Sequence, residues 1–416
     1  MESSSTLTHI AALIAEQLAW LDIDAGESFL ADASGILSPL QAELSGARGD
    51  YRGLISRAAA ATDTAELSTA NDQAINAACT IYFSLNSVAM VQEICTRVRE
   101  AIAERALELA RQELSAAGRT SDLPLALFAV GSDGRKEQTL ITDQDYLFLY
   151  GSGDHDPFAS VEAADDYFGK LGEIFSTKMD EAGISRCSGG IMPVNDEWRG
   201  TLPQWQERLT ALFRFERADW EKNILTLIAL IDSRFICGDR ELGAIFGKTV
   251  RSQVRDTPQA LRHMARVVSS MRLSRGFRRR FVVEAEGPHK GEFNIKIFAW
   301  MPLVMCLRLL AVHVGIEETS TPGRIRRLRK AGHITDKVAA DLHHAYLVIT
   351  RYRIVQQTKK LKRIIDDDCY LNPYELPNQE REELKDVISV IDDLQNTVRS
   401  RFAMTASVDR ILLPRL

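Results

Sequence analysis

The chain has 416 residues, with 51 Lys and Arg against 57 Asp and Glu, so its formal net charge is −6. Apolar residues make up 45% and charged residues 26% of it, which is typical of a globular protein. This composition excludes a disordered chain, a collagen-like fibre and a disulfide-stapled miniprotein. The net acidity disfavours a protein that coats nucleic acid, and the length allows two or three domains.

The cysteines and the apolar segments predict a cytoplasmic protein without a membrane partner. No two of the six cysteines form a CxxC motif, so we expect reduced thiols rather than a zinc or redox knuckle. The first ten residues, MESSSTLTHI, lack the basic and apolar regions of a signal peptide. The longest apolar run, residues 297–307, is too short for a membrane span of about 20 residues, so we expect a buried helix there.

The N-terminal part is predicted to be helical. Residues 1–50 carry eight acids against one base, Arg48, and their apolar residues recur at helical spacing. Two interpretations stay open for this segment: a solvated helical cap, or a docking surface for a basic partner. Residues 71–114 continue the helical pattern with one apolar stripe, and Gly118 is expected to end the helix.

Residues 122–246 have a different, mixed pattern. Residues 123–130 are apolar and of strand length, a turn follows at 131–134, and residues 143–150 predict a second strand. Asp156-Pro157 is expected to begin a helix that runs to about Gly183, as N-cap and first helical residue. We expect a third strand over 184–194 and a helix over 204–236.

The C-terminal part, from about residue 247, is predicted to be helical with local blocks of charge. Residues 251–280 hold nine arginines against Asp256 alone. These arginines are interpreted either as a surface for a triphosphate or an acidic partner, or as a face that pairs with the acidic N-terminal segment. The predicted fold is therefore α+β and predominantly helical, with a small mixed sheet in residues 116–246 between helical regions 1–115 and 247–416.

The chemistry is concentrated in residues 131–145, GSDGRKEQTLITDQD. Gly131 and Ser132 follow a buried strand, where glycine lets the backbone approach a ligand and successive N–H groups can cradle phosphate oxygens. Arg135 and Lys136 add positive charge just beyond this turn. Each of these features alone is often structural, but together they favour an anion site.

Asp143 and Asp145 complete this predicted site. Residues two apart on a strand project from the same face, so both carboxylates point together. Adjacent carboxylates repel each other unless a cation lies between them, and oxygen ligands beside phosphate favour Mg²⁺ or Mn²⁺. The set suits metal-assisted phosphoryl or nucleotidyl transfer.

Gly-Ser, about ten residues, then Asp-x-Asp resembles the signature of the polymerase-β-like nucleotidyltransferase superfamily. The full string is similar to one branch, the nucleotidyltransferases related to protein-PII uridylyltransferase, which often accompany CBS or cyclic-nucleotide-binding modules in bacterial signalling proteins. The resemblance continues through residues 189–202, 231–239 and 286–296, and covers roughly residues 60–400.

The resemblance implies a transferase that moves a nucleoside monophosphate from an NTP to an acceptor, more readily a protein than a small molecule or a nucleic acid. Asp143 and Asp145 would bind catalytic Mg²⁺ or Mn²⁺ ions. The implied nucleotide contacts are Gly131, Ser132, Arg135, Lys136, Arg199, His289 and Lys290. His289 and Lys290 are interpreted equally well as part of a turn, and a homo-oligomer is an open alternative.

The chain departs from the superfamily pattern in one important respect. The predicted strand 184–194 lacks the third carboxylate that often completes such sites, and only Asp196, Glu197 and Asp232 lie nearby in sequence. This departure motivates a second hypothesis: a nucleotide-sensing or partner-binding module with weak or no turnover. Gln144 is also polar where the wider superfamily prefers an apolar residue.

Overall fold

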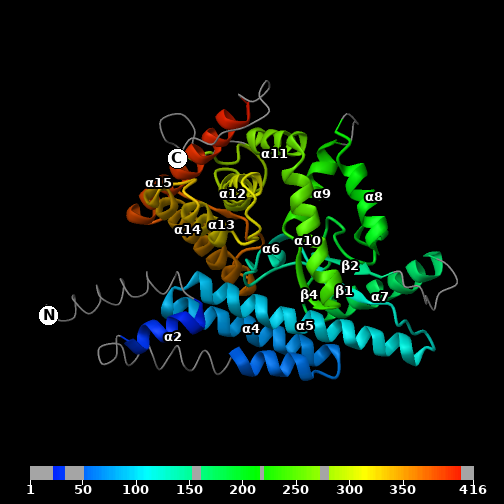
Figure 1. The fold of residues 1–416 in the computed structure, drawn as a ribbon. Coiled ribbons are helices and arrows are strands. Elements are labelled where there is room, and N and C mark those ends of the chain that lie inside the picture. Colours follow the sequence, from blue (N-terminus) through cyan, green and yellow to red (C-terminus); the bar gives the residue numbers. More distant parts are fainter. Residues whose placement is uncertain (1–21, 33–50, 152–160, 216–219, 272–280, 404–416) are drawn as a thin grey trace. The chain divides into compact units, whose positions relative to one another are not determined.

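The computed structural model describes residues 22–32, 51–151, 161–215, 220–271 and 281–403. The protein is mostly helical (67%) with a small four-stranded mixed sheet, so the predicted α+β class is confirmed. The chain forms two compact units (Figure 1). The first unit comprises Met1–Trp205 and Arg234–Ala244, and the second comprises Gln206–Ser233 and Ile245–Leu416.

Long helices form much of the first unit. They are α2 (Ile23–Asp32), α4 (Thr64–Leu85), α5 (Val88–Ala116) and α7 (Val161–Glu181). The predicted helical stretch 71–114 is divided in two at Asn86, which has a left-handed φ of 52°. Ser87 then begins α5 as its N-cap, and its hydroxyl accepts from the Met90 N–H. The predicted apolar stripe of α5 is buried, and α5 packs against both α4 and α7.

The sheet of the first unit has the strand order β3-β2-β1-β4. Its central strands are β1 (Leu125–Ala129) and β2 (Tyr146–Tyr150), which pair antiparallel and are buried at every residue. At the edges, β4 (Arg234–Gly238) pairs antiparallel with β1, and β3 (Arg199–Thr201) pairs parallel with β2. The first two predicted strands are therefore confirmed in their centres, although the second begins only at Tyr146.

Two predicted elements were wrong. Residues 184–194 form a loop rather than a strand, and their only bridge in the described structure joins Ser185 to Asp143. The predicted helix 204–236 is instead α8 (Leu202–Leu212), α9 (Trp220–Ile231) and the strand β4. The short run at β4 follows a helix directly, and only its pairing with β1, over 100 residues earlier, makes it a strand.

The second unit is built from helices around the buried α12. Its elements include α11 (Pro258–Ser270), β5 (Phe293–Asn294), a π-helical turn (Lys296–Trp300), α12 (Met301–His313), α13 (Thr321–Lys330), α14 (Asp336–Leu361), β6 (Tyr370–Leu371) and α15 (Asn378–Ala403). Helix α10 (Arg240–Arg255) belongs to the first unit up to Ala244 and to the second from Ile245. Helix α15 packs against α11, α12 and α14, so the last described helix shares one core with the earlier helices of this unit.

One segment of the described structure, Lys296–His313, is long and apolar enough to cross a membrane. Most of this segment is buried inside the second unit, as expected of a core helix. The predicted buried helix at 297–307 is confirmed. The Asp156-Pro157 helix start, most of the acidic segment 1–50, and part of the arginine block (272–280) lie outside the described residues.

Candidate functional site

The connection between β1 and β2 begins with the short helical turn α6 (Gly131–Gly134). Gly131 has φ +59°, and a Cβ atom at this position would collide with the Asp145 carboxylate. The Val130 N–H donates to the Asp145 carbonyl at 2.9 Å. Glycine is therefore required both by the backbone conformation and by the close approach of the carboxylate.

The N–H groups of this turn are suited to a phosphate. Within the described part of the chain, those of Gly131, Ser132 and Asp133 have no acceptor. The segment after the turn is held to it by the Glu137 N–H, which donates to the Ser132 carbonyl at 2.8 Å. The predicted cradle thus has the free donors that phosphate oxygens need.

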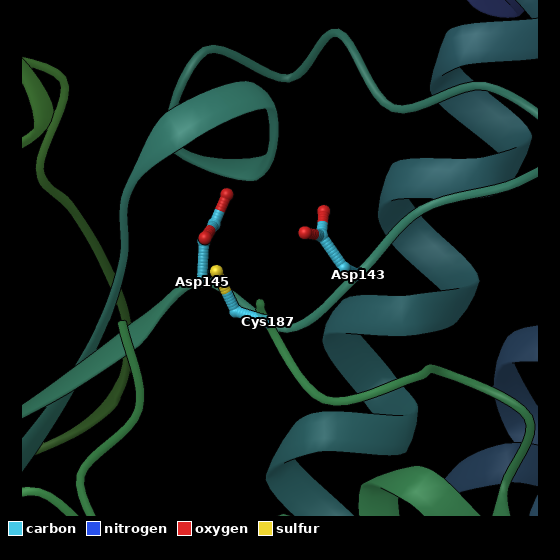
Figure 2. Close-up of side chains that lie close together, drawn as sticks. All are labelled: Asp143, Asp145 and Cys187. Carbon is cyan, nitrogen blue, oxygen red and sulfur yellow. The ribbon is translucent and has the colours of Figure 1, made fainter. Parts of the chain in front are cut away.

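Asp143 and Asp145 lie together as expected, with the Cys187 thiol beside them (Figure 2). One donor atom from each of the three residues lies within 4.8 Å of the other two. Asp143 is exposed, whereas Asp145 and Cys187 are half-buried. Both carboxylates precede β2 instead of lying on it, yet they still lie close together.

Gln144 explains how the 184–187 loop reaches the carboxylates. Its buried side-chain amide donates to the carbonyls of Ser176 at 3.0 Å and Ile184 at 2.8 Å. Its backbone N–H donates to the Ser185 carbonyl at 2.9 Å. A polar residue between the two aspartates therefore fixes the loop that presents Cys187.

The electrostatics of this cluster favour a bound cation. The pKa of Asp145 is raised to about 8, chiefly by burial and next by the charge of the neighbouring Asp143. Burial and the Asp145 charge raise the pKa of Cys187 to about 11. A divalent cation would remove the repulsion between the carboxylates, so these side chains fit a metal ion.

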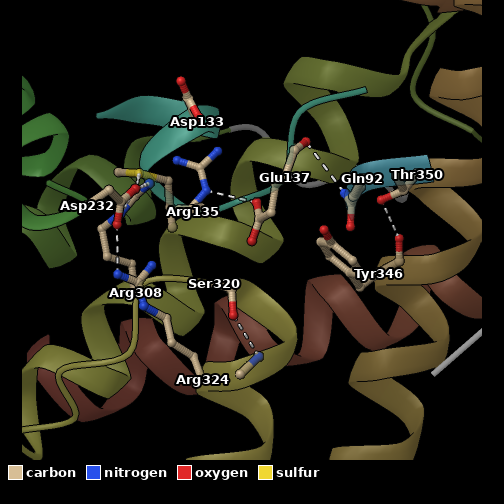
Figure 3. A network of polar contacts seen from close by, with 12 residues as sticks. Gln92, Asp133, Arg135, Glu137, Asp232, Arg308, Ser320, Arg324, Tyr346 and Thr350 are labelled. Atoms are coloured by element: carbon tan, nitrogen blue, oxygen red, sulfur yellow. Dashed lines mark hydrogen bonds and ion pairs between the residues drawn. The ribbon is translucent and has the colours of Figure 1, made fainter. Parts of the chain in front are cut away.

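Helix α5 holds the loop between the turn and the carboxylates. The buried Arg99 guanidinium donates to the carbonyls of Thr139 at 2.6 Å and Leu140 at 2.8 Å. The Gln92 amide donates to the Glu137 carbonyl (Figure 3). Because these buried carbonyls are satisfied by one long helix, the loop has little freedom to move.

The two predicted phosphate-binding cations have different environments. Arg135 is buried and forms an ion pair with Glu137 at 2.8 Å (Figure 3), and its charge also lowers the pKa of Asp145. Lys136 is exposed, with φ +57°. Of the two, Lys136 can turn toward a phosphate without breaking a buried ion pair.

Arg234 is a residue of the site region that sequence reasoning missed. Its guanidinium donates to the Asp133 carbonyl at 2.9 Å and to the Asp133 carboxylate at 3.1 Å, and it also pairs with Glu100 on α5. Burial nevertheless raises the pKa of Asp133. Arg234 thus joins β4, α5 and the turn, and its place in residues 231–239, a stretch that shares the family resemblance, was the sequence signal that could have indicated it.

Arg199 lies on the edge strand β3, opposite Phe148 in the register. Its guanidinium forms two hydrogen bonds to Asp165, at 2.8 and 2.7 Å, and one to the Val194 carbonyl at 2.7 Å. These bonds join α7 to β3. The nucleotide contact expected of Arg199 stays a prediction.

His289 and Lys290 belong to the second unit. His289 Nδ1 lies 2.6 Å from Glu292 Oε2, and its ring stacks on Tyr370 with centroids 3.7 Å apart. Lys290 is exposed in a turn and donates its N–H to the Gly287 carbonyl. Their nucleotide contacts also stay predictions.

His289 lines a pocket of about 770 Å³ in the second unit. The lining holds five acids against one lysine, Lys359, together with two tyrosines. The acids are Glu292, Asp366, Asp367, Glu375 and Glu380. The pocket therefore suits a ligand with positive charge.

The sequence left three candidates for a third carboxylate. Asp232 is fully buried in the second unit, where Arg308 and Arg324 bind its two oxygens (Figure 3). Asp196 and Glu197 are exposed in a 3₁₀ turn. Among the described residues, Cys187 is the third donor beside the aspartates. The sequence held no signal for this, because Cys187 occupies a loop.

Two family models match the chain. Residues 74–218 match the model described as "Putative nucleotidyltransferase DUF294", and residues 258–402 match the model described as "Putative nucleotidyltransferase substrate binding domain", DUF294_C. A search of curated proteins finds no match. The first match contains the Gly131-Ser132 turn and both aspartates, and the second contains the acid-lined pocket. The chain therefore carries a domain of the family described as "Putative nucleotidyltransferase DUF294", followed by the substrate-binding domain DUF294_C.

Proposed function

We propose that the protein is a Mg²⁺- or Mn²⁺-dependent nucleotidyltransferase that moves a nucleoside monophosphate from an NTP to an acceptor. The observation that carries this proposal is the placement of the Asp145 carboxylate against Gly131, with Asp143 beside it. A phosphate cradle next to paired carboxylates is the arrangement that phosphoryl-group chemistry requires.

The residues of the first unit have distinct roles in this reaction. Gly131 and Ser132 bind phosphate oxygens through their N–H groups, and Lys136 adds charge. Asp143 and Asp145 hold the divalent cation. That cation, when bound, neutralises charge on the reacting phosphate and lowers the pKa of the acceptor hydroxyl. Arg99 and Gln144 keep these groups in place through their bonds to the surrounding loops.

The finer assignment is a protein-PII uridylyltransferase-like enzyme of cytoplasmic signalling that modifies a protein. The resemblance of residues 131–145 supports the branch. The acid-lined pocket in the DUF294_C domain supports an acceptor with basic side chains, because its lining contains five acids and one lysine. A protein surface supplies such basic groups more readily than a nucleic acid does.

The second candidate function is a nucleotide-binding sensor with weak or no turnover. The observation that favours it is the thiol of Cys187 beside the aspartates, because a neutral thiol is a weaker general base than a carboxylate. In this case the same site would bind an NTP and signal through a partner.

Labelled NTPs separate the two functions. The purified protein is incubated with Mg²⁺ and each labelled NTP, alone and with cell extract, beside a double variant with Asp143→Asn and Asp145→Asn. The exposed Asp196→Asn is the matched control. The transferase predicts a labelled acceptor that disappears only in the double variant. Nucleotide binding without transfer under every condition contradicts the transferase and supports the sensor.

A further inference from the structure

We propose that Asp143, Asp145 and Cys187 form a mixed carboxylate–thiolate centre that binds a thiophilic divalent cation, such as Zn²⁺ or Co²⁺, in preference to Mg²⁺. The proposal deepens the proposed function, since it rests on the same aspartate pair. It adds Cys187 as a ligand and predicts which metals the site prefers.

The spacing of the donor atoms allows this centre to form. The three donors lie within 4.8 Å of one another. Zinc bonds of about 2.0 Å to oxygen and 2.3 Å to sulfur place tetrahedral donors roughly 3.3 to 3.7 Å apart. Rotation of side chains closes this difference, and Figure 2 shows the sulfur next to the Asp145 carboxylate, with Asp143 facing both.

The backbone of Cys187 is held where the centre needs it. The Cys187 carbonyl accepts from the Gly190 N–H at 3.0 Å, and Gly190 has φ +71°. Three residues earlier, the Ile184 carbonyl accepts from the Gln144 amide at 2.8 Å. Gln144 lies between the aspartates, so its hydrogen bonds connect the aspartate segment to the start of the loop that carries Cys187. A thiol on a free loop would have to be ordered first.

The donor chemistry sets the metal preference. Mg²⁺ takes oxygen ligands and keeps several waters, so it gains little from a sulfur atom. Thiolate ligands favour Zn²⁺ and other soft ions, and binding releases the thiol proton. Since both kinds of ion use Asp143 and Asp145, a thiophilic ion competes with Mg²⁺ and Mn²⁺ for the site.

Other partly buried thiols provide the comparison. Cys79 and Cys369 are also half-buried thiols. Neither belongs to a group of three metal-binding side chains in the part of the chain that the structure describes. Cys369→Ser is therefore a matched control for Cys187→Ser.

The test is a Co²⁺ titration followed by absorption, which does not depend on turnover. A thiolate bound to Co²⁺ gives a charge-transfer band in the near ultraviolet. We expect this band in the wild type and in Cys369→Ser, and its loss in Cys187→Ser. In calorimetry, Cys187→Ser should bind Zn²⁺ at least about tenfold more weakly while keeping its Mn²⁺ affinity within about threefold.

Two outcomes overturn the proposal: the absence of the band in the wild type, or equal Zn²⁺ affinities of the wild type and Cys187→Ser. If Cys187→Ser does not fold, alkylation of the wild type, mapped by mass spectrometry, replaces it, and Zn²⁺ must slow the reaction at Cys187. The band together with no transfer from any NTP would refute the proposed function alone. Transfer with Mg²⁺ but no band would refute this inference alone.

Discussion

The two units differ in how the charge of their carboxylates is compensated. In the second unit, Asp232 is fully buried, and Arg308 and Arg324 both donate to it, so its charge is compensated within the fold. In the first unit, Asp143 and Asp145 lie side by side, and burial with mutual repulsion raises the pKa of Asp145 to about 8. The first arrangement stabilises a fold, whereas the second needs a cation from outside.

The difference shows how a functional carboxylate can be distinguished from a structural one. Both kinds lie in sequence next to strands or helices, and both are acidic residues near the predicted site. What separates them is whether the chain itself provides the opposite charge. The charge of Arg135 lowers the pKa of Asp145, but Arg135 is already paired with Glu137.

The largest effect is expected from removing one carboxylate of the uncompensated pair, Asp143 and Asp145. Asp145→Asn should lower the rate of nucleotidyl transfer by roughly 10³-fold or more, because a metal ligand acts directly on the transition state. Its stability without metal should not fall at neutral pH, because the raised pKa leaves Asp145 largely uncharged there and Asn is a neutral side chain of the same shape. The two readouts are label transfer and thermal unfolding. A variant that loses activity only because it unfolds would contradict this account.

The next largest effect is expected from removing the charge of Asp232, the carboxylate that the fold itself compensates. Asp232→Asn leaves Arg308 and Arg324 buried without their counter-charge, so the free energy of unfolding should fall by about 3 to 5 kcal/mol. Urea unfolding measures this loss. The control is Asp256→Asn, which removes an exposed ion pair with Arg255 and should change stability little. Equal effects of the two variants would show that burial of Asp232 does not matter.

Gly131→Ala tests how closely the turn approaches the aspartates. The substitution adds strain at φ +59° and a collision with Asp145, so we expect a loss of about 1 to 3 kcal/mol in stability and weaker metal binding. Gly118→Ala has similar strain, at φ +75°, but nothing within 4 Å of its Cβ. Calorimetric Mn²⁺ titration of both variants should show weaker binding only in Gly131→Ala; equal affinities would refute the close approach.

The pH dependence of metal binding sharpens the same contrast. With a pKa of about 8, Asp145 is largely protonated at neutral pH without metal, so a metal must displace that proton. Apparent Mn²⁺ affinity should rise up to about tenfold per pH unit and level off above pH 8. A flat profile between pH 6 and about 8 would contradict the raised pKa.

The same pKa also affects folding. Since the folded pKa is raised, the protonated group stabilises the metal-free protein fully below about pH 4, and this contribution is lost as pH rises through about 8. Asp145→Asn should flatten that part of the stability profile. Urea unfolding at several pH values measures it.

The smallest expected effect concerns the acid-lined pocket. Glu380→Lys and Glu375→Lys should raise the KM for a basic protein acceptor by severalfold and leave NTP affinity unchanged, because both glutamates line a pocket of the second unit. Glu382→Lys, on the same helix as Glu380 but outside the pocket lining, is the control. An unchanged KM in the pocket variants would remove the pocket from the acceptor assignment.

The sequence predicted much of this molecule because its signals there are local. Continuous apolar runs predicted β1 and β2, and the turn and the two aspartates were predicted together by their spacing. The predictions failed where long-range contacts decide the outcome. Residues 234–238 form a strand only through pairing with β1, and residues 184–194 form a loop that begins at the Ile184 and Ser185 carbonyls, both of which accept hydrogen bonds from Gln144. Cys187 joined the site through that loop.

The most direct test of the central claim is Mn²⁺ binding, followed by electron paramagnetic resonance, to the protein with a non-hydrolysable NTP present. The account predicts that the wild type and Asp196→Asn bind Mn²⁺ equally well. The double variant with Asp143→Asn and Asp145→Asn should bind at least about 100-fold more weakly, because both ligands are lost. Equal binding by the double variant would contradict the claim that the uncompensated aspartate pair is the metal site.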